Sequence, residues 1–85
     1  MFTIIWGTKA VRQLNRILVP KTQKAILEKI SELQNFPDCD NVKFLRNHKY
    51  DGRLRVGNYR VLFKIMNVIQ VISIEEVKNR DDQTY

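Results

Sequence analysis

The chain has 85 residues, of which 15 are Lys or Arg and 9 are Asp or Glu, so its formal net charge is +6. The length fits one domain, residues 1–85, and 44% hydrophobic beside 28% charged residues is typical of a folded protein. A single cysteine, Cys39, excludes an internal disulfide, and a single histidine, His48, argues against a metal site built from His and Cys.

The distribution of hydrophobic residues and the net charge indicate the cellular compartment and the kind of binding partner. The N-terminal residues lack the basic start and long hydrophobic segment of a signal peptide, and no stretch approaches the roughly 20 apolar residues that span a bilayer. We therefore expect a cytoplasmic protein without a membrane partner. The excess of positive charge favours an anionic partner, either nucleic acid or an acidic protein.

The first half of the chain predicts a strand followed by two helices. Residues 2–6 (FTIIW) are β-branched and aromatic, as in a strand. Thr8 is placed to cap a first helix that runs to about residue 18, where apolar residues recur at helical spacing. Pro20 interrupts this pattern and suits the first turn of a second helix, predicted over residues 21–35.

The second half predicts three strands. Residues 36–41 (FPDCDN) are rich in turn formers and end the second helix, and an irregular connection then returns the chain to the core. Strand-like runs follow at residues 53–56, 59–66 and 69–74, before a polar tail. The order β-α-α-β-β-β predicts an α+β fold, in which a helical hairpin packs on a small, largely antiparallel sheet.

The clearest indication of function is the predicted hairpin RLRVGNYR, residues 53–60. Its Gly-Asn pair suits a two-residue turn, because glycine accepts the positive φ of a type I′ or II′ turn. This turn places Arg55 opposite Arg60, and the alternation of side chains sends Arg53 to the same face. Like charges directly opposite each other are unfavourable, whereas guanidinium groups match phosphate. We interpret the three arginines as an anion site, with an ordinary solvated face as the alternative.

Together with this hairpin, the whole segment LRNHKYDGRLRVGNYRVLFKI (residues 45–65), followed by a strand and the tail VKNRDDQTY, resembles the RelE/ParE superfamily of bacterial and archaeal toxins. The likeness covers nearly the whole chain. It implies the toxin of a type II toxin–antitoxin system, held inactive by a cognate antitoxin in a complex that is expected to bind operator DNA.

For the RelE-type branch, the resemblance implies an endoribonuclease that cleaves mRNA in the ribosomal A site and so inhibits translation. Its partners are then mRNA and ribosomal RNA, and it needs no metal or other cofactor. In this reaction a ribose 2′-hydroxyl attacks the adjacent phosphate, which leaves a 2′,3′-cyclic end and a 5′-hydroxyl fragment. Two alternatives stay open: a ParE-like inhibitor of DNA gyrase without nuclease activity, and a degenerate, non-toxic member.

The resemblance also assigns roles to single residues. Arg60 matches the arginine that contacts the scissile phosphate, and Arg53 falls where a basic residue helps to stabilise the transition state. Arg80 resembles an arginine that assists near the leaving group, and Tyr85 a C-terminal tyrosine that stacks on or activates the substrate. The expected substrate-binding residues include Arg55, beside the catalytic pair. By their charge, Lys43, Arg46 and Lys49 are expected to extend the basic surface toward ribosomal RNA, with a charged loop that only keeps the protein soluble as the alternative.

The chain departs from the family pattern at two places. Asp51 lies where well-studied nucleases of the family carry a second lysine, so the site loses one cation. The spacing from Arg80 to Tyr85 is one residue longer than the common pattern.

His48, the natural candidate for a general base near neutral pH, lies in the loop before the arginine strand and is expected to be solvent-exposed.

Overall fold

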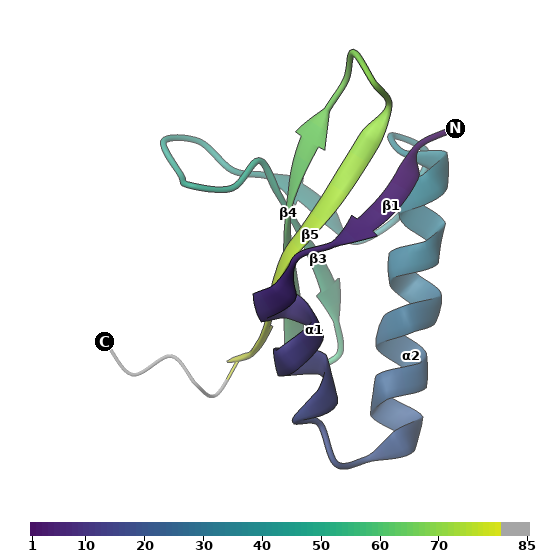
Figure 1. Ribbon diagram of the computed structural model, residues 1–85, viewed down its shortest axis with the longest axis vertical. Helices are drawn as coiled ribbons and strands as arrows, with labels where there is room; N and C mark the ends of the chain where they lie inside the picture. The colour runs from purple at the N-terminus through teal and green to yellow at the C-terminus, as the bar shows by residue number, and fades with distance from the viewer. Residues whose placement is uncertain (81–85) are drawn as a thin grey trace.

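The computed structural model describes residues 1–80 and contains two α-helices and a five-stranded sheet (Figure 1). In chain order the elements are β1 (Thr3–Trp6), α1 (Thr8–Asn15), α2 (Pro20–Ser31), the 3-10 helix η1 (Glu32–Asn35), β2 (Val42–Phe44), β3 (Gly52–Val56), β4 (Tyr59–Met66) and β5 (Val71–Asn79). The strand order is β1-β5-β4-β3-β2, with β1 parallel to β5 and the other neighbours antiparallel. The predicted α+β fold, a helical hairpin on a largely antiparallel sheet, is confirmed.

The first helix differs from its prediction at both ends. It ends at Asn15, earlier than residue 18, and Gly7 rather than Thr8 is its N-cap. The early end is possible because the side-chain amide of Gln23 on α2 donates hydrogen bonds of 3.0 and 2.8 Å to two carbonyl oxygens there. The second helical segment keeps nearly its predicted extent, although its last turn is η1. No helix in the described part of the chain is long and apolar enough to cross a membrane.

The sheet has one strand more than predicted, and its last strand is shifted along the chain. Residues 42–44, expected in an irregular connection, pair with β3 as the edge strand β2. The last predicted strand, residues 69–74, is confirmed at residues 71–74, but it begins two residues later than predicted. Ile69 lies exposed in the turn before β5, where Gln70 has a φ of 55°. Residues 75–79, expected in the polar tail, continue β5, and residues 76–79 pair with β4.

One hydrophobic core lies between the helices and one face of the sheet (Figure 1). Its buried members are Phe2, Ala10, Ile17, Ile26, Ile30, Leu33, Leu54, Val61, Phe63, Ile72, Ile74 and Val77. Gly52 begins β3 without a side chain because the ring of Phe63 occupies that space: a Cβ there would lie 2.5 Å from the ring. The core therefore holds the central strands from one side and leaves their other face free for polar side chains.

A β-bulge in β5 decides which residues reach that other face. Phe63 pairs with Ile74 and Leu62 pairs with Glu76, so Glu75 is an extra residue in the ladder. The bulge reverses the alternation of β5, and Val77 returns to the core after it. Glu76, and Lys78 two residues later, consequently lie on the face away from the helices.

Candidate functional site

The β3–β4 hairpin has the register that its turn predicts. Gly57 has a φ of 55°, which the first central position of the turn requires. Arg55 pairs with Arg60, and Arg53 lies two residues before Arg55 on the same face, as expected. The opposite face of the hairpin is fixed in the core by Leu54, Val61 and Phe63. The backbone that carries the arginines is therefore held rigidly from behind.

These arginines are not neutralised by any carboxylate of residues 1–80, since none of the ion pairs there includes them. Arg53 is half-buried, and its buried Nε has no hydrogen-bond partner in that part of the chain. Burial, and then the charges of Arg55 and Arg60, lower the pKa of Arg53, although a guanidinium stays charged in proteins. Three uncompensated guanidinium groups on one face form a site suited to phosphate.

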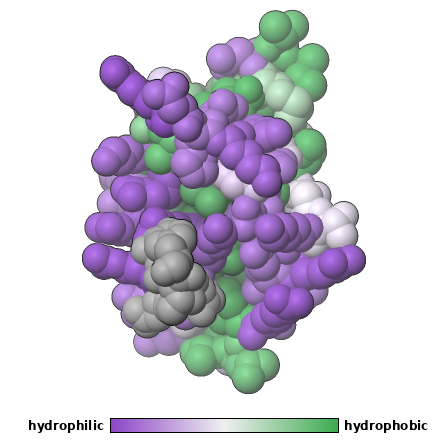
Figure 2. All heavy atoms as spheres, turned by 90° about the vertical axis from the view of Figure 1, so that its left-hand side faces the viewer, coloured by the Kyte–Doolittle hydropathy of each residue, from purple (hydrophilic) through white to green (hydrophobic). Residues whose placement is uncertain are grey.

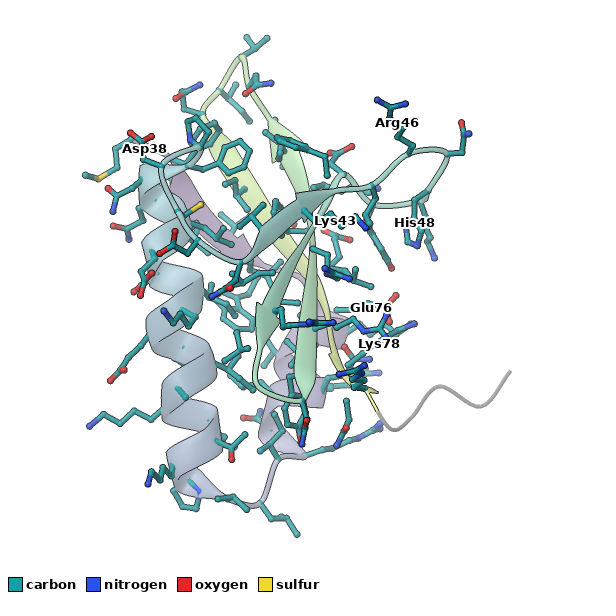
Figure 3. The ribbon with its side chains drawn as sticks, turned by 180° about the vertical axis from the view of Figure 1, so that it is seen from behind. Asp38, Lys43, Arg46, His48, Glu76 and Lys78 are labelled. Carbon is teal, nitrogen blue, oxygen red and sulfur yellow. The ribbon has the colours of Figure 1, made fainter. Side chains whose placement is uncertain are left out.

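The other predicted basic residues divide into two groups. Lys43 on β2 pairs with Arg53 and extends the cationic face to the edge of the sheet. Arg46 and Lys49 lie exposed, together with His48, in the loop between β2 and β3, which projects beyond the sheet (Figure 3). The structure thus brings Lys43 together with the arginines and places the loop residues on a separate flank.

Asp51, at the position of the missing lysine, is engaged with the backbone of β4. Its Oδ2 accepts a hydrogen bond of 2.8 Å from the backbone N–H of Ile65, and its own N–H donates to the carbonyl oxygen of Phe63 at 3.0 Å. This carboxylate therefore fastens the loop to the sheet and forms no ion pair with the arginines.

The tail begins beside the hairpin turn. The backbone N–H of Arg80 donates to the carbonyl oxygen of Asn58 at 2.6 Å, and the Arg80 side chain is exposed. Tyr85 lies outside the described residues, so its role stays a prediction.

A second group of charged residues, which the sequence analysis did not predict, surrounds Glu76 on the same face. Glu76 is 4% exposed, and its Oε2 accepts a hydrogen bond of 2.5 Å from the hydroxyl of Tyr50. Its Oε1 lies 3.3 Å from the Nζ of Lys9 on α1 and 3.6 Å from the Nζ of Lys78 (Figure 3). The sequence signal for this set is the change in the spacing of apolar residues after Ile74, which in a continuous strand requires an extra residue.

These contacts set the protonation states of the set. Burial alone would raise the pKa of Glu76, but the Tyr50 hydrogen bond and the Lys9 and Lys78 ammonium groups outweigh it and lower this pKa. Burial and the bond to Glu76 raise the pKa of Tyr50 to about 12. Glu76 is therefore an anion at neutral pH. Its contribution to stability is present above its unfolded pKa and is lost as the pH falls through its lower folded pKa.

The surface on this side of the molecule is mostly hydrophilic (Figure 2). Exposed apolar residues gather at its two ends, among them Val68 in the β4–β5 turn, 98% exposed, and Leu18 in the α1–α2 loop, 89% exposed. Residues 1–80 contain no group of three or more His, Cys, Asp or Glu side chains that could hold a metal ion. A cavity of about 340 Å³ lies instead on the helix side of the hairpin turn, between Val56, Tyr59 and α2. The face that carries Arg53, Arg55 and Arg60, the arginine face, is thus an open, charged surface suited to a polyanion.

Comparison with known proteins gives the fold a name. No protein-family model and no curated protein matches the sequence. Among solved structures, the toxin–antitoxin complex RelBE2 from Mycobacterium tuberculosis is 28% identical, with 93% of this chain and 98% of that chain covered and a TM-score of 0.78. The archaeal RelE–RelB complex from Pyrococcus horikoshii is 24% identical, with 95% and 97% covered and a TM-score of 0.77. The isolated RelE toxin of E. coli is 14% identical, with 93% and 84% covered and a TM-score of 0.76.

The chain therefore has the α+β fold of the RelE-type toxins. The resemblance to this superfamily that the hairpin and tail indicate is confirmed by the structural likeness.

Proposed function

We propose that the chain is the toxin of a type II toxin–antitoxin system and acts as a ribosome-dependent mRNA endonuclease. The observation that carries the proposal is the arginine face, where Arg53, Arg55 and Arg60 have no carboxylate partner within residues 1–80. The RelE fold supports it, and RelE–RelB complexes among the similar structures support an antitoxin as the partner. Its place of action is then the cytoplasm.

The proposed reaction is the attack of a ribose 2′-hydroxyl on the adjacent phosphate. The 2′-hydroxyl loses its proton and its oxygen forms a bond to phosphorus, while the bond to the 5′-oxygen breaks and that oxygen gains a proton. The products are a 2′,3′-cyclic phosphate and a 5′-hydroxyl. Negative charge grows on the phosphoryl oxygens in the transition state, so cations fixed before the reaction lower the barrier. Arg60 holds the scissile phosphate, Arg53 stabilises the developing charge, and Arg55 binds the neighbouring backbone.

The ribosome supplies the alignment that this small open face does not provide. Arginines are poor general bases, so much of the rate is proposed to come from positioning of the mRNA in the A site. In this scheme Arg80 assists near the leaving group and Tyr85 stacks on or activates the substrate. Three further basic residues contact ribosomal RNA: Lys43, Arg46 and Lys49.

The test is primer extension on an mRNA in a translating extract. Codon-specific breaks are expected with the wild-type protein, and Arg60→Ala is expected to reduce them by about 100-fold or more, the usual effect of removing one transition-state donor. Lys24→Ala, which removes an equal charge from the exposed side of α2, should cut like wild type. Intact mRNA accompanied by gyrase-dependent DNA breaks would replace the nuclease with the ParE-like inhibitor. If the protein causes neither effect, the non-toxic alternative holds.

A further inference from the structure

The cationic row of the site is longer than the hairpin. Arg55 on β3 lies directly opposite Arg60 on β4, and Arg60 lies directly opposite Lys78 on β5. Directly opposite residues have Cβ atoms about 4.5–5.5 Å apart, so the three cations form one line across three adjacent strands. Such a line is unfavourable for the folded protein alone, because each member repels its neighbour.

Lys78 reaches this line because of the bulge. Without an extra residue in β5, the alternation that buries Ile72 and Ile74 would turn Lys78 toward the core. With Glu75 as the extra residue, Lys78 lies opposite Arg60, and its side chain is 50% exposed. Its ammonium group is thus available at the surface beside Arg60.

Glu76 anchors this lysine without using its hydrogen bonds. The Nζ of Lys78 lies 3.6 Å from the Oε1 of Glu76, which is an ion pair but too long for a hydrogen bond, and Oε1 has no hydrogen-bond partner in residues 1–80. Within residues 1–80, Lys78 thus forms this ion pair and no hydrogen bond, so its N–H donors can turn to a ligand. The carboxylate itself is fixed by Tyr50, which is 6% exposed, and is covered by Lys9.

The geometry of Glu76 does not suit direct contact with a substrate. Its side chain is 5% exposed, and the hydroxyl of Tyr50 and two ammonium groups surround its oxygens. A general base must lie within hydrogen-bond reach of the proton that it removes. Glu76 acts on the lysines beside it and is a positioning residue.

We propose that Lys78 is a phosphate-binding residue of the site, in line with Arg55 and Arg60, and that Glu76, held by Tyr50, positions it. The ligand is the phosphate backbone of a single-stranded RNA. The inference rests on the proposed function, since it names a further contact to the same substrate.

The test measures binding of the full chain to a single-stranded RNA whose 2′-O-methyl groups prevent cleavage, across a series of salt concentrations. Each lost phosphate contact lowers the slope of log K against log[salt] by about 0.7 for a single strand. Lys78→Ala is expected to lower the slope by this amount and to weaken binding several-fold, while Lys78→Arg restores it. Lys24→Ala, with the same change of net charge, should leave the slope unchanged.

Arg60→Ala separates this inference from the proposed function. If Arg60→Ala leaves RNA binding at the wild-type level, the proposed RNA substrate is wrong. If Arg60→Ala weakens binding and Lys78→Ala behaves like Lys24→Ala, the RNA site stands and the role of Lys78 is overturned.

The role of Glu76 is tested by a double-mutant cycle. In a Glu76→Gln protein, Lys78 is no longer held by a charge, so Lys78→Ala should weaken RNA binding less than it does in the wild type. Tyr50→Phe, which keeps the ring and removes only the hydroxyl, provides the same cycle if Glu76→Gln fails to fold. Equal effects of Lys78→Ala in both backgrounds would show that Glu76 does not position this lysine.

Discussion

At the scale of single residues, Arg53, Arg55 and Arg60 form no ion pair within residues 1–80, and the buried carboxylate of Glu76 contacts other groups. Glu76 lies opposite Leu62, two residues along β4 from Arg60, and contacts Tyr50 and two lysines. A carboxylate paired to Arg60 in the bidentate manner would occupy the donors that a phosphate needs. The arrangement of Glu76 therefore leaves the proposed anion site unblocked and explains how an acid is tolerated on a cationic face.

The Tyr50–Glu76 hydrogen bond gives a prediction at this scale. Because the pKa of Tyr50 is raised from 10.0 to about 12, one tyrosine should ionise late in an ultraviolet absorbance titration of the folded protein. The stability that this bond contributes is fully present below pH 10 and is lost as the pH rises toward about 12. Tyr50→Phe should remove the late step. A late step that persists in Tyr50→Phe would belong to another residue and would contradict the assignment.

At the scale of elements, the hairpin turn sets the geometry of the arginines. Gly57 adopts a φ of 55°, and a Cβ there would meet no atom within 4 Å, so any cost of a side chain comes from the backbone alone. Gly57 thus acts on the hairpin through its backbone conformation and not through side-chain packing.

Substitutions at Gly57 test this directly. Gly57→Ala should lower the free energy of unfolding by about 1–2 kcal/mol, the cost of a left-handed conformation for a residue with a Cβ. Gly57→Asn should lower it less, because asparagine tolerates this conformation better. Urea unfolding of the three proteins gives the comparison. Equal stability of Gly57→Ala and wild type would mean that the turn does not hold a positive φ in solution.

The β3–β4 and β4–β5 hairpins differ in how much of their pairing the sequence predicts. The pairing of Arg55 with Arg60 follows from the turn at Gly57-Asn58, because a two-residue turn at this place permits only one pairing register. The pairing of Arg60 with Lys78 depends on a bulge inside a strand, and no turn residue marks it. The turn residues therefore predict the position of the arginines, whereas for Lys78 and Glu76 the sequence offers only the changed spacing of apolar residues after Ile74.

At the scale of the whole molecule, the layers separate two kinds of surface. The helices and the core cover one face of the sheet, and the cations lie across the other (Figures 1 and 3). The fold is shared with the RelE-type toxins, but a fold hosts its activity through the residues of its site. The proposed function therefore depends on the arginine face and not on the fold alone.

The most direct test of that account is arrest of protein synthesis after induction of the full chain in cells, comparing two triple variants of equal charge. One carries Arg53→Ala, Arg55→Ala and Arg60→Ala on the hairpin; the other carries Arg12→Ala, Arg16→Ala and Lys24→Ala on the helix side. The hairpin variant should fold at least as stably as wild type, because like charges are removed, and should not arrest synthesis, whereas the helix-side variant should arrest it fully. Full arrest by a folded hairpin variant would contradict the central claim.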